Sequence, residues 1–298
     1  MNFGQAERMD LAAADARFLR LESLGDGRFH YDVTDDLCRL DGRLYGGTAL
    51  ASSIAAAEAV SGRPAVWMTT QFVASAPGGI RISVLAEVLA AGGRTNQVRV
   101  TGTDPDGTVI YASLGATCHP RPHGLSATFE HMPTVEPPDD ATPWENPFAG
   151  MARAAGYDGP LPKLPSDVGF HRVVEYREPT VLEHPAAGPG RICLWVRRRD
   201  GVPLSRTLVA YVADMVPLGI AQGCGVVAGG VSLDNTIRFG AGEPTEWVLV
   251  DIRPHLVAGG YGHGDALIWN QAGELVAVAS QIASLVPFDL AAAFPRTD

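Results

Sequence analysis

Hydrophobic and polar positions along the chain follow the same pattern twice. In the first copy, an alanine-rich apolar segment opens at the glycine pair Gly46 and Gly47, and its length and composition predict a helix. Apolar and polar residues then alternate in four segments rich in Val, Ile and Thr and separated by Gly and Pro, which predicts strands. These segments begin at Ala65, Ile80, Gly92 and Thr108.

The second half of the chain repeats this order. An almost wholly apolar segment over residues 206–222 predicts a single helix. Each copy also has an extended segment before its helix, near Phe29 and near Arg191. The strand-like segments after the second helix begin at Val231, Glu246, Gly259 and Glu274.

The two copies stay in register along their length. Phe72 and Phe239 both end the first strand after a helix, and the glycine pairs at Gly92 and Gly259 are separated by the same interval. Each unit therefore reads as a strand, a helix and four further strands. One long helix against a curved antiparallel sheet is an α+β arrangement, so we predict an α+β fold in tandem.

A stretch with little periodicity and much Pro, Asp and Gly separates the copies and is typical of a linker. We predict a first unit over residues 1–121, a linker over 122–165 and a second unit over 166–298. Trp144 and Phe148 indicate that part of the linker packs on the body of the protein.

Charge and composition narrow the classes of function. The chain has 23 basic and 33 acidic residues, a formal charge of −10, which disfavours nucleic acid as a partner. An anionic substrate would need a local basic patch. The N-terminal segment lacks the pattern of a signal peptide, and no stretch approaches the ~20 apolar residues of a membrane span. We therefore expect a cytoplasmic protein without a membrane partner.

The cysteines give no sign of a metal centre. No CxxC spacing occurs among them, so we expect neither a metal nor another cofactor. A chain of this length does not need disulfides for stability, and nothing marks it as secreted. The four cysteines are Cys38, Cys118, Cys193 and Cys224.

Positions at which one copy has a polar residue and the other an apolar residue are candidates for a function that only one copy performs. Aligned on the core pattern, Asp214 of the second helix faces Ile54 of the first. A buried carboxylate costs several kcal/mol unless it is hydrogen-bonded or used in chemistry. The alternative is an aspartate at a helix end, because Pro217 interrupts the helical hydrogen bonds nearby.

At two strand positions as well, the second copy has a polar residue where the first copy has a small non-polar one. Ser232 stands where the first copy has Ala65, and Gln281 stands where it has Gly115. A serine in a strand is most often a surface or backbone-bonding hydroxyl, whereas Gln281 interrupts an apolar segment and is more informative. The three differences together carry more weight than any one of them.

These residue types suit hydrolysis by an activated water. A carboxylate such as that of Asp214 can take a proton from water, and a hydroxyl and a carboxamide can hold that water by hydrogen bonds. No cysteine or histidine completes a nucleophilic triad with them in the sequence, which favours direct attack by water over an acyl-enzyme. A thioester is a fitting substrate because a thiolate, with a thiol pKa of roughly 8.5, leaves readily.

The glycine pair that opens the first helix is a candidate oxyanion hole. The N–H groups of Gly46 and Gly47 lie at a predicted helix N-terminus, where they can polarise a carbonyl oxygen. The alternative is a glycine turn that lets the helix pack closely on the sheet.

Over about residues 20–288 the chain resembles the type II acyl-CoA thioesterases, which are double-hotdog enzymes of fatty acid metabolism. The segments that carry the resemblance are LYGGTALASSIAAAEAV, AYVADMVPL, GVSLDNTIRF, EWVLVD and GELVAVASQIASLV. The resemblance implies a tandem hotdog fold, an acyl-CoA substrate, and water activation by Asp214, Ser232 and Gln281. It also implies a homo-oligomer in which double hotdogs pair through their sheets.

The chain departs from that family at one motif position, where Asn235 replaces a frequent histidine. Arg43, Arg94 and Arg99 are candidates for contacts with CoA phosphates, although isolated arginines are usually surface ion-pair partners.

Two other functions remain open from the sequence. An enoyl-CoA hydratase or dehydratase would pair an aspartate with a catalytic histidine on an early helix and loop, but all eight histidines lie outside the two predicted helices. A non-catalytic protein that binds acyl thioesters, or a repurposed hotdog protein, would keep the fold without turnover.

Overall fold

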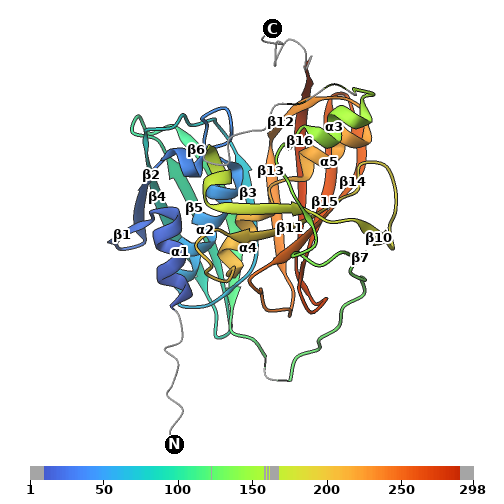
Figure 1. Ribbon diagram of the computed structural model, residues 1–298. Helices are drawn as coiled ribbons and strands as arrows, with labels where there is room; N and C mark the ends of the chain where they lie inside the picture. The colour runs from blue at the N-terminus through green and yellow to red at the C-terminus, as the bar shows by residue number, and fades with distance from the viewer. Residues whose placement is uncertain (1–9, 122, 158, 160, 162–167, 289–298) are drawn as a thin grey trace, which may run out of the picture.

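A computed structural model describes residues 10–121, 123–157, 159, 161 and 168–288 (Figure 1). The predicted ends of the linker, at residues 122 and 165, and the outer ends of both predicted units lie outside the described residues. The division into two units and a linker therefore stays a prediction at its boundaries. No helix in the described part of the chain is long and apolar enough to cross a membrane.

The first helix forms as the sequence predicts. Helix α2 (Gly46–Ser61) is rich in alanine, buries most of its length and ends at Gly62, whose positive φ of 64° suits a glycine cap. The elements that precede it are α1 (Leu11–Leu19), β1 (Glu22–Gly25), β2 (Arg28–Asp32) and the 3-10 turn η1 (Asp35–Leu37). The strands that follow it are β3 (Ala65–Phe72), β4 (Arg81–Ala91), β5 (Thr95–Thr103) and β6 (Val109–Cys118).

The prediction of a single second helix is wrong. The segment forms two helices, α4 (Arg206–Val212) and α5 (Val216–Gly223), with Asp214 in the break between them. Pro217 explains the break, because its ring excludes the carbonyl four residues back and it cannot continue the hydrogen-bond ladder. At the start of α5 the same proline is favourable.

The strands of the second half keep the predicted order, with one division. The segment from Val231 belongs to two strands on either side of Leu233, and both pair with the last strand. The strands of the second half that belong to the large sheet are β9 (Val174–Glu178), β11 (Ile192–Arg198), β12 (Ala228–Ser232), β13 (Asp234–Phe239), β14 (Val248–Ala258), β15 (Tyr261–Asn270) and β16 (Leu275–Pro287).

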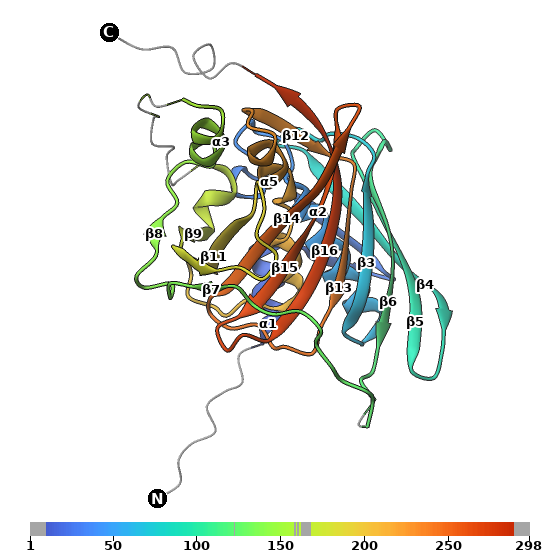
Figure 2. The same ribbon diagram turned by 90° about the vertical axis from the view of Figure 1, so that its right-hand side faces the viewer.

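One antiparallel sheet joins the two halves (Figure 2). Strands β3 and β13 pair at its centre, where Thr69 lies opposite Thr236 and their hydroxyl oxygens are 2.9 Å apart. These two threonines are separated by the interval that relates the repeats. An approximate twofold axis therefore passes between them and relates one half to the other.

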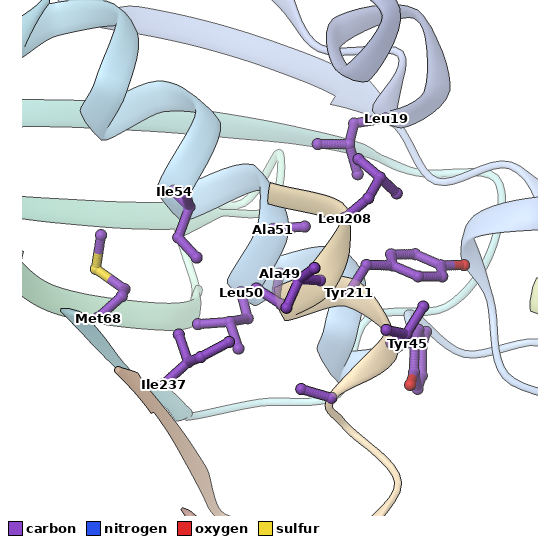
Figure 3. Packing of buried hydrophobic residues seen from close by; sticks show 14 of the residues in the cluster. Leu19, Tyr45, Ala49, Leu50, Ala51, Ile54, Met68, Leu208, Tyr211 and Ile237 are labelled. Carbon is purple, nitrogen blue, oxygen red and sulfur yellow. The ribbon is translucent and has the colours of Figure 1, made fainter. Parts of the chain in front are cut away.

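Helices α2 and α5 pack on the concave side of this sheet and share one core. Helix α2 packs on β3 to β6, α5 packs on β12 and β14 to β16, and α4 packs against α2. Figure 3 shows Leu50 and Ile54 of α2 facing Met68 of β3 and Ile237 of β13. Because the core is continuous across the repeats, neither half buries its helix alone.

Part of the linker packs on the body of the protein at Trp144 and Phe148, and an earlier part of it covers the outer face of the second half. Trp144 packs on Tyr176 of β9 with ring centroids 5.4 Å apart. The indole N–H of Trp195 donates to the carbonyl of Glu136 at 2.8 Å. The remaining short elements are β7 (Thr134–Val135), β8 (Thr142–Pro143), α3 (Ala149–Ala154), η2 (Gly169–Arg172) and β10 (Val181–Glu183), the last of which follows β9.

Candidate active site

The break between α4 and α5 places Asp214 at the junction of the two halves. Its side chain is buried, and the start of α2 lies directly beside it. The alignment of Asp214 with Ile54 is wrong. At the interval that relates the strands, Asp214 corresponds to Gly47, and Ile54 is an ordinary core residue. The extra helix α4, which has no counterpart before α2, explains the misalignment.

The sheet register agrees with the other two internal alignments. Ser232 pairs with Ala283 of β16, as Ala65 pairs with Thr117 of β6. By the same criterion, Gln281 and Gly115 occupy equivalent positions, because each lies opposite an equivalent residue of the preceding strand. The comparison of the copies therefore identified two of the three polar substitutions in the correct register.

The carboxamide of Gln281 connects the three residues. Its Nε2 donates to Asp214 Oδ1 in a short hydrogen bond and to Ser232 Oγ at 2.6 Å. The three side chains come from the helix break, the end of β12 and the middle of β16. The structure thus brings together residues that are far apart in sequence.

Asn235 is a fourth member of this group that the sequence did not assign to the site. Its Nδ2 donates to Asp214 Oδ1 at 3.4 Å, and its side chain is fully buried. The carbonyl oxygens of the Asn235 and Gln281 side chains have no hydrogen-bond partner among the described residues. The sequence contained one signal, since Asn235 and the core residue Ile237 share a strand face at a spacing of two.

Burial governs the protonation of Asp214. It raises the pKa of the carboxyl from 3.8 to about 7. Hydrogen bonds from Asn235 and Gln281, the charge of Arg39 and the N–H of Gly47 oppose this rise without cancelling it. A carboxylate with a pKa near neutrality is well matched to general-base work.

Both glycines at the start of α2 are required by close packing. A Cβ on Gly46 would lie 2.3 Å from Asp214 Oδ2, and one on Gly47 would lie 2.2 Å from the carbonyl oxygen of Tyr211. These contacts agree with the alternative reading of a packing glycine. They also put the first N–H groups of α2, which have no acceptor within the helix, beside the carboxylate.

Two cavities adjoin this group, and their linings share Asp214, Ser232, Tyr45 and Arg39. Arg39 was not among the predicted site residues. Its guanidinium donates to the carbonyl of Gly230 at 3.2 Å and pairs with Asp41. Because the contact with Gly230 links the first half to β12, no local sequence pattern could have identified it.

The three arginines that the sequence suggested for CoA phosphates do not form a patch at this site. Arg99 pairs with Glu87 of β4 at 2.8 Å, the surface ion pair that the alternative reading expected. Arg43 donates to Ser75 Oγ at 3.4 Å near one cavity. A role for Arg94 stays a prediction.

A second buried polar cluster lies on the covered outer face of the second half, around Cys193. His184 Nε2 is 2.8 Å from Asp251 Oδ1, and the three side chains lie close enough to hold a metal ion. The N–H of Ala186 donates to His184 Nδ1, which places the ring proton on Nε2, toward Asp251. Arg253 occupies the other oxygen of Asp251. In this arrangement the ring N–H of His184 and the guanidinium of Arg253 both donate to Asp251.

Comparisons with known proteins agree with this fold. Residues 137–285, half of the chain, match the family model described as the acyl-CoA thioesterase C-terminal domain. The solved structures that resemble the chain include hotdog proteins, so the predicted tandem hotdog α+β fold is confirmed. The chain belongs to the type II acyl-CoA thioesterase family.

Three solved structures illustrate the similarity. A proposed thioesterase from Novosphingobium aromaticivorans is 29% identical, with a TM-score of 0.74, over 89% of this chain and 98% of that one. A hotdog-fold protein of unknown function from Alicyclobacillus acidocaldarius is 20% identical, with a TM-score of 0.74, over 93% and 99%. An acyl-CoA thioesterase II from Mycobacterium marinum is 21% identical, with a TM-score of 0.70, over 92% and 99%. A comparison with curated proteins found no match.

Proposed function

We propose that the protein hydrolyses an acyl-CoA thioester to a free acid and CoA by direct attack of a water that Asp214 activates. The observation that carries the proposal is the contact of the Gln281 amide with both Asp214 and Ser232. This polar group is buried at the meeting point of two cavities. Buried groups of this kind with a perturbed pKa are typical of catalytic sites.

In the proposed reaction, Asp214 Oδ2 takes one proton from the water while the water oxygen bonds to the thioester carbon. Oδ1 already accepts from two amide donors, whereas Oδ2 lies beside Gly46. The hydroxyl of Ser232 and the carbonyl oxygen of Gln281 hold the water. The intermediate then breaks its C–S bond, and the departing thiolate takes the proton back from Asp214.

The start of α2 supplies the proposed oxyanion hole. The N–H of Gly47 already interacts with the Asp214 carboxylate, so we assign the main contact with the developing oxyanion to the N–H of Gly46. A helix N-terminus favours negative charge, and a preorganised donor in a buried site stabilises it strongly.

The proposed physiological setting is fatty acid metabolism in the cytoplasm, with two double hotdogs paired through their sheets. Leu85 and Leu114 support the pairing, because both expose apolar side chains on the outward face of the first half. Sedimentation at several concentrations would test it. A monomer at every concentration would contradict this part of the proposal.

The first test is release of free thiol from CoA esters of increasing chain length, with wild-type protein and Asp214→Asn measured side by side. Turnover that the substitution abolishes would support the proposal. Binding of the esters without turnover would favour the non-catalytic alternative. Hydration of an enoyl-CoA double bond without thiol release would favour the hydratase alternative.

A further inference from the structure

The two cavities beside Asp214 both have mainly apolar linings, but one of them runs along a strand edge that is unpaired in the described part of the sheet. A thioester has two arms that diverge from its carbonyl carbon, an acyl group and the pantetheine arm of CoA. Because both cavities reach Asp214 and Ser232, a thioester held there would place one arm in each. That edge decides which arm each cavity suits.

The first cavity, here called the α2 cavity, has a volume of about 230 Å³ and lies between the start of α2 and the ends of β3 and β6. Its lining is mainly apolar. Ala49, Ile110 and Tyr111 form its inner end, and all three are almost fully buried. The ring of Tyr111 lies on Gly102, where even an added Cβ would come within 2.3 Å of it. The Tyr111 ring is therefore held in place by this packing.

The second cavity, here called the β12 cavity, has a volume of about 290 Å³ and runs along Gly229 and Gly230. In the described part of the sheet, β12 pairs only with β16, so its other edge presents backbone amide groups. The carbonyl of Gly230 points to that edge, because it accepts from Arg39. An unpaired strand edge is suited to a ligand that carries amides.

We propose that the α2 cavity holds the acyl group and limits it to short and medium chains, and that the β12 cavity holds the pantetheine arm. This inference rests on the proposed function. The pantetheine arm contains two amides, which match the backbone edge of β12, and this leaves the α2 cavity, with the buried side chains of Ala49, Ile110 and Tyr111, for the acyl chain. Ile110 and Tyr111 act as the stop that sets the chain length.

The volume gives the scale of the limit. An apolar protein cavity of about 150 Å³ holds benzene, a molecule of six carbons. On the same scale, the α2 cavity accommodates an acyl group of about eight carbons. Longer chains would have to displace Ile110 or Tyr111 or remain in water.

The test measures the binding of S-alkyl-CoA thioethers, which cannot be hydrolysed, as a function of chain length. Each methylene that enters the cavity should tighten binding about fourfold. We expect this gain to stop near eight carbons. A gain that continues unchanged through palmityl-CoA thioether would overturn the inference. Thiol release from the matching esters is measured in parallel, and its absence would count against the proposed function alone.

Three variants locate the stop. Ile110→Ala should extend the preferred chain by about two to three carbons, and Ala49→Leu should shorten it. Leu218→Ala, in the β12 cavity, is the matched comparison and should change affinity by the same factor at every chain length. If Leu218→Ala shifts the length preference and the other two do not, the arms are assigned the wrong way round.

Discussion

The two halves of the sheet carry the same elements, but only the second opens its helix. In the first half, α2 runs unbroken through the core from Gly46. In the second half, the chain leaves the helix after Val212 and resumes it at Val216, which brings the Asp214 carboxylate to the junction. A helix interior would bury that carboxylate among apolar neighbours, whereas the break lets it meet amide donors.

The strands differ in the same way. The place of Gln281 is taken in the first half by Gly115, where a Cβ would lie 2.8 Å from Met68 Sδ. A chain of hydroxyls runs beside it, from Thr70 to Ser113 at 2.8 Å and on to Ser53 at 2.9 Å. These hydroxyls satisfy one another and include no ionisable group. The first half therefore supplies stability and the proposed oxyanion hole, and the second supplies the polar side chains of the proposed chemistry.

The largest effect expected is on the proposed base. Asp214→Asn keeps the shape of the side chain but cannot accept a proton, so thiol release should fall roughly thousandfold. Ser53→Ala in the first half removes one buried hydroxyl from the hydrogen-bonded row of hydroxyls described above. It should lower stability by about 1 kcal/mol and leave the rate within about twofold. Equal losses of activity in the two variants would remove the functional difference between the halves.

The strands and the first helix were predictable because alternation, glycine punctuation and the internal repeat all point the same way. The same repeat identified Ser232 and Gln281, since a strand register is fixed by a period of two. A single helix was preferred over residues 206–222 because the residues on both sides of Asp214 keep a helical apolar pattern, although Pro217 had indicated a helix end there as the alternative. Asn235 was not assigned because its partner, Asp214, lies on another element, and its burial depends on how the two halves meet.

Asp214 should also destabilise the protein at alkaline pH. Its pKa is 3.8 ordinarily and about 7 in the folded protein, so the folded state binds the proton more tightly. The contribution to stability is complete below pH 3.8 and is lost as the pH rises through 7. At pH 8, Asp214→Asn should therefore be more stable than wild type by up to about 4 kcal/mol. In urea unfolding, the advantage should shrink as the pH falls, and a variant that is less stable at pH 8 would contradict the assignment.

Substitution of Gly46, at the start of α2, should have the next largest effect on catalysis after substitution of the proposed base Asp214. The added Cβ in Gly46→Ala would lie 2.3 Å from Asp214 Oδ2 and 2.9 Å from the Phe72 ring, so the carboxylate must move. A displacement of this kind should lower kcat roughly ten- to hundredfold. Gly93→Ala is the control, since nothing lies within 4 Å of its Cβ. Wild-type kcat in Gly46→Ala would show that the close approach has no catalytic role.

The smallest effect is expected at Asn235, and it should appear only at low pH. Activity requires ionised Asp214, so the wild-type rate should rise with pH around a midpoint of about 7. The hydrogen bond from Asn235 lowers the pKa of Asp214, and Asn235→Leu should move the midpoint to higher pH. At pH 6 the variant should be roughly three- to tenfold slower, with rates converging at pH 9. Thr236→Val, on the opposite strand face, should leave the midpoint in place, and a uniform loss in Asn235→Leu at every pH would mean that Asn235 is structural.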